Sequence, residues 1–209
     1  MTGRSRRLAS QRLARRSKST ASAILASAAS ATSTALTAHD DLALSIASDF
    51  IKPQEGLRTT AYLCSAGKWT IGYGHTDGVK PGMVWSRQHA EHMFKQRLVQ
   101  DFARVKATWP GASLLHPAAQ AALISLVYNR GADLTKRERD PLDRRREMRE
   151  LRGAIAERDY GRMAELFRSM KRLWMDASGK AIPKYAGLLT RRDDEADLCL
   201  RAANDSPSR

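Results

Sequence analysis

Apolar side chains recur every three or four residues through most of the chain after residue 40, which is the spacing of helices with one buried face. Ser86 is suited to cap the start of one such helix, and Pro117 suits the first turn of another. Pro53 disfavours the helical conformation at Lys52, so we expect the first helix to end there. The pattern therefore predicts helices over residues 40–52, 86–109, 117–130, 144–157, 160–174 and 190–203.

A different pattern occupies residues 58–76, where aromatic, β-branched and glycine residues replace the helical period. Residues 65–68 read Ser-Ala-Gly-Lys and supply a turn between two short runs of strand-forming residues. We expect a small antiparallel sheet that carries Cys64 and Thr70 on adjacent strands or in their turn. The chain is therefore predicted to be an α+β protein that is mostly helical.

The net charge of the 209-residue chain is +14, and its distribution is uneven. Residues 1–39 hold seven basic side chains and no acidic one, and residues 135–172 hold thirteen basic and eight acidic ones. Such a field attracts polyanions, among them nucleic acid and the lipopolysaccharide, teichoic acids and anionic lipids of bacterial envelopes. The chain shows no nucleic-acid-binding motif and no surface of alternating basic and aromatic residues, so we expect no specific nucleic-acid partner.

Composition divides the chain into a basic, Ala/Ser/Thr-rich tail over residues 1–39 and a folded domain over residues 40–205. Three interpretations of the tail stay open. It is a solvated disordered segment, or a cationic arm that binds the envelope, or it contains a signal or anchor segment. The third interpretation rests on residues 19–38, which carry no charge and are long enough to cross a bilayer, although few of them are strongly apolar.

The segment from Glu55 to Gly78 brings together a carboxylic acid, a thiol and a hydroxyl, because Glu55, Cys64 and Thr70 are separated by eight and five residues. Glycosidic cleavage needs one group that protonates the leaving oxygen and another that prepares a water molecule. Glu55 suits the first task if partial burial keeps it protonated. The thiol of Cys64 stands where a second carboxylate is expected. It acts as base or nucleophile, holds the water, or only fills space.

This segment resembles the phage-type lysozymes, the endolysin muramidases of glycoside hydrolase family 24. The shared features are Glu55-Gly56, the Glu-x8-Cys-x5-Thr spacing and the run from Thr70 to His75. The resemblance covers most of residues 40–205 and none of residues 1–39. It implies a two-lobed lysozyme-like fold with a small sheet and an active-site cleft between the lobes. It also implies hydrolysis of the β-1,4 bond between N-acetylmuramic acid and N-acetylglucosamine in bacterial peptidoglycan.

The same resemblance implies roles for residues of the catalytic segment. Glu55 is the general acid, and Cys64 contributes less than Glu55 because an ordinary thiol is mostly protonated at neutral pH. Thr70 helps to position the attacking water, which favours inversion at the anomeric carbon. Thr70 is otherwise an ordinary strand residue. His75 orients the site and contacts substrate, or it is a structural histidine of the sheet.

Two later motifs extend the resemblance. The run Leu123 to Gly131 is similar to the family helix that ends beneath the cleft, with Tyr in place of the usual Phe. Asn129 then contacts an N-acetyl sugar, or it caps the helix. The run Gly187 to Ala196 is similar to the family's Gly-Leu-x-x-Arg-Arg-x-x-Glu-Ala. Arg191 and Arg192 then line the substrate cleft, or they only form the basic start of a helix.

No histidine or cysteine cluster has the spacing of a metal site, so we expect neither a metal nor another cofactor. The predicted protein is a monomeric peptidoglycan hydrolase that is made in the host cytoplasm and acts in the periplasm or cell wall. If the tail is a cationic arm, we expect it to bind the anionic envelope, through lipopolysaccharide or anionic lipid. Two alternatives remain: a lytic transglycosylase, and a cationic envelope-binding protein with weak or no catalysis.

Overall fold

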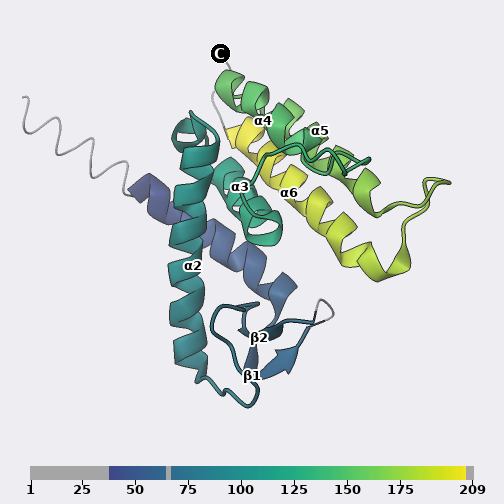
Figure 1. Ribbon diagram of the computed structural model, residues 1–209. Helices are drawn as coiled ribbons and strands as arrows, with labels where there is room; N and C mark the ends of the chain where they lie inside the picture. Colours follow the sequence, from purple (N-terminus) through teal and green to yellow (C-terminus); the bar gives the residue numbers. More distant parts are fainter. Residues whose placement is uncertain (1–37, 65–66, 206–209) are drawn as a thin grey trace, which may run out of the picture. The chain divides into compact units, whose positions relative to one another are not determined.

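The computed structural model describes residues 38–64 and 67–205 of the chain (Figure 1). Contacts divide the chain between Asp41 and Leu42, and the elements below lie in the unit Leu42–Arg209, apart from residues 38–41 at the start of the first helix. The tail over residues 1–39 therefore lies almost wholly outside the described residues, as does the candidate signal or anchor segment within residues 19–38.

The first helix ends at residue 55, so the prediction that it ends at Lys52 is wrong. Pro53 lies in its last turn, and the helix nevertheless closes with a hydrogen bond from Gly56 N–H to the Lys52 carbonyl (3.1 Å). Gly56 then adopts a positive φ of 67°, a conformation common just after helix ends. Ile51 is fully buried, and such packing outweighs the local preference against proline. Glu55 is consequently held by the final helical turn.

Two short strands follow and form an antiparallel pair, β1 (Arg58–Leu63) and β2 (Trp69–Gly72). The register places Tyr62 opposite Thr70. The pair continues past the strand ends, because the Cys64 N–H donates to the Lys68 carbonyl (2.9 Å). The sequence prediction of a small sheet with Cys64 and Thr70 in one hairpin is confirmed.

Two helices that the sequence predicts closely form the middle of the fold. Helix α2 spans Arg87–Thr108 and is capped by the Ser86 hydroxyl, which accepts from the His89 N–H. Helix α3 spans Pro117–Arg130 and is buried from Pro117 to Tyr128. Since α3 has no polar face, it is a core helix, and it contacts both α2 and α6 (Figure 1).

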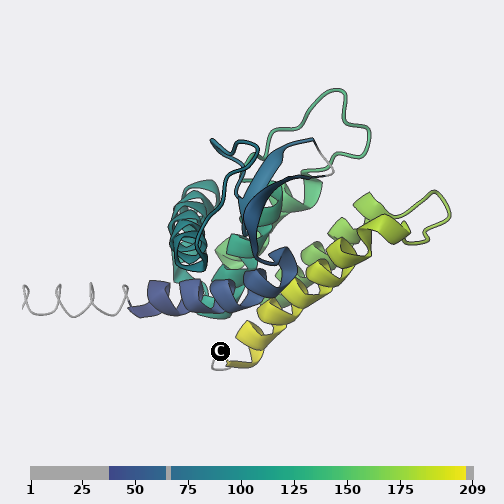
Figure 2. The same ribbon diagram turned by 90° about the horizontal axis from the view of Figure 1, so that it is seen from below.

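The C-terminal part is a helical layer. It comprises α4 (Arg146–Glu157), α5 (Tyr160–Ser169), two short 3-10 turns at Met170–Trp174 and Pro183–Tyr185, and α6 (Ala186–Asp205). Helix α5 lies alongside α6 in both views (Figures 1 and 2). The last helix begins four residues before the predicted position, because the 3-10 turn at Pro183–Tyr185 leads directly into it.

The described structure is mostly helical with one two-stranded antiparallel sheet, which confirms the predicted fold class. Its core is apolar and runs from the first helix through α2 and α3 to α6. Among the helices of the described residues, none is both long enough and apolar enough to span a membrane.

Candidate functional site

Glu55 lies at the end of the first helix and faces Arg191 of α6. The Arg191 Nη1 donates to Glu55 Oε1 over 2.6 Å, although the two residues are 136 positions apart in the chain. The Arg191 side chain is only 5% exposed, whereas the Glu55 side chain is 22% exposed. The arginine is therefore a buried, fixed part of the site, and the carboxylate reaches solvent.

A buried hydroxyl fixes the Arg191 guanidinium. Ser125 of α3 accepts from Arg191 Nε at its hydroxyl oxygen (3.1 Å) and from Nη2 at its carbonyl (3.3 Å). The Ser125 hydroxyl in turn donates to Glu195 Oε1 (2.5 Å), one helical turn beyond Arg191. All three Arg191 nitrogens have partners, whereas Glu195 Oε2 is buried without a partner among the described residues. Hydrogen bonds that share buried groups in this way restrict the guanidinium to one orientation. Nη1 is thereby directed toward Glu55.

Arg192 and Asn129 lie beside this network. Arg192 is fully buried, and its Nη2 donates to Glu195 Oε1 (2.8 Å) and to Asn129 Oδ1 (3.4 Å). Burial lowers the pKa of Arg192, and the nearby Glu195 opposes that effect. The C-cap of α3 is Gly131, so Asn129 does not cap the helix as one interpretation held. Its amide instead lies at the edge of a cavity.

This cavity has a volume of about 480 Å³ and contains Glu55, Asn129 and Arg191 in its lining. Lys184 and Tyr185, from the 3-10 turn before α6, complete one side of it. The Lys184 ammonium lies 4.9 Å from the centre of the Tyr185 ring. A cavity of this size, with a few convergent polar groups, has the dimensions of a small-molecule or sugar site.

Gly74 and Tyr128 lie close to the Glu55 carboxylate. Gly74 has a φ of +80°, and a Cβ at that position would lie 3.4 Å from Glu55 Oε2 and 4.0 Å from the Tyr128 hydroxyl. The Tyr128 hydroxyl donates to the Tyr73 carbonyl. Burial raises the pKa of Tyr128, and the charge of Glu55 adds to the effect. The phenol is therefore a neutral donor that ties α3 to the turn after β2.

The other two predicted catalytic residues lie together in the hairpin. Cys64 is half-buried, whereas the space-filling interpretation expects a fully buried thiol. Thr70 is 4% exposed, and its hydroxyl donates to the Lys68 carbonyl (3.0 Å), which also accepts from Cys64 N–H. Neither residue is among the described residues that line the cavity around Glu55.

His75 lies apart from these groups. Its Nε2 donates to the Asp77 carbonyl (2.9 Å), and its ring is centred 5.1 Å from the Trp85 ring. It is not among the described residues that line the Glu55 cavity. Within the described part of the chain, no group of three or more His, Cys, Asp or Glu side chains is arranged to hold a metal ion.

Sequence reasoning did not assign roles to Ser125 or Tyr128. Ser125 is a polar residue inside an otherwise apolar, fully buried helix, and such a residue needs a buried partner. Tyr128 replaces the usual Phe of the motif, so its extra hydroxyl also needed an acceptor. The buried serine and the additional hydroxyl were both visible in the sequence. Their hydrogen-bond partners, Glu195 and Tyr73, come from distant parts of the chain.

A partly exposed carboxylate at the edge of a sugar-sized cavity suits an enzyme that cleaves glycosidic bonds. Comparisons with known proteins agree. A family model described as phage lysozyme matches residues 52–195. An endolysin of Acyrthosiphon pisum secondary endosymbiont phage 1 is 34% identical over 151 residues, which is 71% of this chain and 90% of the relative. The chain belongs to the phage lysozyme family and is a peptidoglycan hydrolase, a glycoside hydrolase that acts on the bacterial cell wall.

Solved structures share the fold. The endolysin of Escherichia coli O157:H7 phage FAHEc1 has a TM-score of 0.52 and 28% identity, and the match covers 74% of this chain and 90% of that one. The active form of the P1 phage endolysin has a TM-score of 0.59 at 21% identity, covering 77% of this chain and 86% of that one. Because its identity is only 21%, the similarity to the P1 phage endolysin supports a shared fold and nothing more.

Proposed function

We propose that Glu55 is the general acid that protonates the bridging oxygen between N-acetylmuramic acid and N-acetylglucosamine. The observation that carries this proposal is its position: it is a partly exposed carboxyl at a cavity of about 480 Å³, oriented by a buried arginine. The acid must reach the glycosidic oxygen to within hydrogen-bond distance. The final helical turn and the Arg191 contact together fix the direction of the carboxyl, so this condition can be met without a loop movement.

The ion pair with Arg191 sets a requirement for the proton. One carboxyl oxygen of Glu55 is held by Arg191, so the other oxygen must carry the proton to the glycosidic oxygen. Glu55 Oε2 is the oxygen that faces Gly74 rather than Arg191. We therefore assign proton delivery to Oε2.

The hairpin supplies the groups that prepare the water. The Thr70 hydroxyl gives its hydrogen to the Lys68 carbonyl, so its oxygen lone pairs are left to accept from a water molecule. The half-buried thiol of Cys64 lies in the same hairpin and acts as a base or holds the same water. Attack by water from the face opposite the acid inverts the anomeric carbon, which needs a wide separation between the two sides.

Substrate contacts are assigned to residues that line the cavity. Asn129 suits the N-acetyl group because an amide both donates and accepts, and Lys184 and Tyr185 offer an ammonium and an aromatic face. Arg191 contacts the acid and lines the cavity, and Arg192 acts through Asn129. His75 lies by Trp85, so we assign it to orientation of the turn after β2.

The bond and the reaction type are tested by digestion of purified peptidoglycan, followed by mass spectrometry of the products. Hydrolysis at the proposed bond leaves a muramic acid reducing end. Anhydro-muramic ends would establish the lytic transglycosylase alternative, in which a sugar hydroxyl replaces water. Intact glycan strands together with bound protein would establish the envelope-binding alternative.

For the rest of the chain, we propose a catalytic domain over residues 40–205 and a basic segment over residues 1–39 that binds the anionic envelope. The seven basic and no acidic side chains of that segment support the proposal. Removing residues 1–39 should leave digestion of soluble glycan unchanged and weaken binding to lipopolysaccharide vesicles at low salt. We propose that the protein acts as a monomer after synthesis in the host cytoplasm, which sedimentation of the full chain tests.

A further inference from the structure

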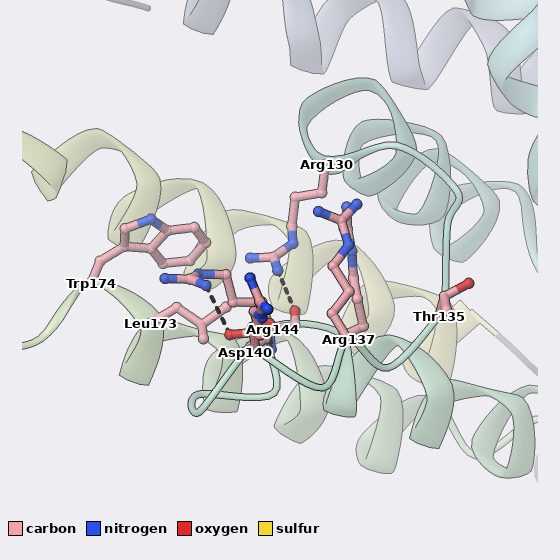
Figure 3. Close-up of a pocket in the computed structure, with 9 residues that line it drawn as sticks. Arg130, Thr135, Arg137, Asp140, Arg144, Leu173 and Trp174 are labelled. Atoms are coloured by element: carbon pink, nitrogen blue, oxygen red, sulfur yellow. Dashed lines mark hydrogen bonds and ion pairs between the residues drawn. The ribbon is translucent and has the colours of Figure 1, made fainter.

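A second cavity of about 480 Å³ lies between the end of α3, the loop over residues 131–145 and the 3-10 turn at Met170–Trp174 (Figure 3). We call it the arginine pocket. Its lining includes five arginines and an indole: Arg130, Arg137, Arg139, Arg144, Arg145 and Trp174. The proposed catalytic mechanism uses none of these side chains. We therefore ask which ligand a pocket with five arginines would bind.

Protein carboxylates balance only part of the positive charge in the arginine pocket, through the pairs Arg137–Asp133 (3.4 Å) and Arg144–Asp140. Asp140 is the acidic residue of the lining, and it is occupied by Arg144 (2.8 Å). Arg145 Nη1 donates to a sulfur atom, the Met148 Sδ (3.2 Å), and Arg130 donates to the Arg144 carbonyl. Within the described residues, no ion pair reaches Arg130, Arg139 or Arg145. The guanidinium groups of these three arginines are therefore available to pair with a bound anion.

Burial makes the positive charge of Arg130 energetically unfavourable. Its Nε is buried and has no hydrogen-bond partner among the described residues. Burial lowers the pKa of Arg130 to about 10; the charges of Arg145 and Arg192 act in the same direction, and those of Glu147 and Glu195 oppose it. Burial also lowers the pKa of Arg145. A bound anion would offset the repulsion between these neighbouring cations.

The walls of the arginine pocket indicate what carries the anion. Figure 3 shows the Arg130 guanidinium between the indole of Trp174 and the backbone of Arg144. The guanidinium lies 5.3 Å from the centre of the Trp174 ring. The cavity is much larger than a bare phosphate, so it has room for the group that carries the phosphate. Arg130 directly follows Asn129, which lines the Glu55 cavity.

We propose that the arginine pocket binds a phosphate ester carried by a saccharide. Guanidinium forks match phosphate oxygens in pairs, and the charge excess exceeds what one carboxylate would neutralise. The saccharide part of the assignment rests on the proposed function, because its support is the adjoining Glu55 cavity. A phosphorylated envelope glycan could then be bound beside the strand that is cut.

The test is calorimetric titration of the full chain in phosphate-free buffer at fixed ionic strength, with glucose 1-phosphate, inorganic phosphate and glucose as separate probes. Glucose 1-phosphate should bind more tightly than inorganic phosphate, and glucose should not bind detectably. Arg139 is exposed, so Arg139→Gln carries little risk to folding. Arg139→Gln and Arg145→Gln should each weaken binding of glucose 1-phosphate about tenfold, the loss expected for one charge-assisted contact.

Arg152→Gln is the matched control, because Arg152 is exposed on α4 and does not line the arginine pocket. Its affinity for glucose 1-phosphate should match that of the wild type. Arg145→Lys keeps the charge but loses the fork, so it should fall between wild type and Arg145→Gln. Equal losses in Arg152→Gln and Arg139→Gln would contradict the proposal, as would absence of binding to the wild type.

Two further measurements separate this proposal from its rivals. Glu55→Gln should lose peptidoglycan hydrolysis and keep its affinity for glucose 1-phosphate, so failure of one proposal is visible without failure of the other. A short single-stranded DNA should bind less tightly than glucose 1-phosphate at equal ionic strength. If the DNA binds more tightly and Arg139→Gln and Arg145→Gln reduce that binding, the pocket is a nucleic-acid site and the proposal is overturned.

Discussion

At the scale of single residues, the proposed chemistry depends on how one arginine is held. Arg191 has three nitrogen atoms with assigned partners: Nε and Nη2 contact Ser125, and Nη1 contacts Glu55. Glu195 Oε1 also lies 3.5 Å from Arg191 Nε. A lysine could replace the charge of this side chain but not its geometry, because an ammonium is a single point of contact.

Arg191→Lys should therefore reduce peptidoglycan digestion by about 10- to 100-fold, a range in keeping with misplacement of a catalytic group. The expected cause is a Glu55 carboxyl that is no longer held in one direction. Initial rates on purified peptidoglycan measure the effect. Arg201→Lys is the control, since Arg201 is exposed on the same helix. Arg191→Lys with the rate of the wild type would show that the guanidinium geometry is unimportant.

Cys64 offers a second prediction at this scale. Cys64→Ser should lose less activity than Glu55→Gln, because a hydroxyl can still hold a water molecule but glutamine cannot donate an acidic proton. Cys199→Ser is not a matched control, since Cys199 is buried and burial raises the pKa of its thiol. The matched comparison is Cys64→Ala, which removes the polar atom. If Cys64→Ser and Glu55→Gln lose equal activity, Cys64 is as necessary as the acid.

The sequence predicted Glu55, Cys64 and Thr70 as a set because they share one short segment. It also indicated Arg191, but only through a resemblance, since no spacing rule connects residues 136 positions apart. The role of Ser125 could not be predicted, because its partner Glu195 is brought close only by packing of α3 on α6. Long-range polar pairing is a property of the folded packing rather than of local pattern.

At the scale of elements, the turn after β2 brings backbone close to the acid. Gly74 needs its positive φ of 80° and also the space that a Cβ would take from Glu55 Oε2. Gly78 shares the first need, with a φ of +65°, but no heavy atom lies within 4 Å of its Cβ position. Alanine at each of these two positions therefore distinguishes the effect of backbone strain from an effect on the position of the Glu55 carboxyl.

Gly74→Ala and Gly78→Ala should each lower the free energy of unfolding by about 1–2 kcal/mol, the cost of a left-handed alanine. Gly74→Ala alone should also slow peptidoglycan digestion at least about tenfold, because its methyl group displaces the acid. Urea unfolding and initial rates measure the two effects. Equal activity of the two variants would show that the turn does not position Glu55.

Element boundaries show where local pattern is sufficient. Helix α3 was predicted at its observed bounds, because Pro117 and Gly131 mark its ends and its interior is apolar throughout. The first helix was cut short in the prediction, because the preference against proline was weighed without the buried face that includes Ile51. The 3-10 turn at Pro183–Tyr185 has no periodic signal, so the start of α6 was misplaced.

At the scale of the whole molecule, one acid connects three separate parts of the described fold. Glu91 of α2 forms an ion pair with Lys52 of the first helix and accepts from the Tyr73 hydroxyl (2.6 Å). The hydrogen bond from Lys52 is the main reason that the pKa of Glu91 lies below its ordinary value. Because the folded pKa is lowered, this stabilisation is present above the unfolded pKa of 4.5 and disappears as the pH falls through the folded value.

Glu91→Gln should therefore lower the free energy of unfolding by about 1 kcal/mol at pH 7, and the difference from wild type should shrink in acid, toward zero below the folded pKa. Urea unfolding at several pH values from 7 downward measures it. Glu165→Gln serves as control, because Glu165 forms an exposed pair with Arg162 on α5. A Glu91→Gln deficit that persists at the lowest pH would contradict the assignment of the effect to the ionised carboxylate.

The charge of the whole chain adds a further consequence. A net charge of +14 favours anionic surfaces, and such attraction weakens with salt. The Glu55 cavity combines acidic and basic lining residues, whereas the arginine pocket has an excess of positive charge. Salt should therefore affect attachment to the envelope more strongly than digestion of an isolated, uncharged glycan.

Comparison of Glu55→Gln with the wild type on purified peptidoglycan tests the central claim most directly. Both proteins should unfold at similar urea concentrations, so that a difference in rate reports chemistry. Loss of the proton donor should slow release of muramic acid reducing ends by about 100-fold or more, the contribution typical of general acid catalysis. Release of these ends by folded Glu55→Gln at the rate of the wild type would contradict the account.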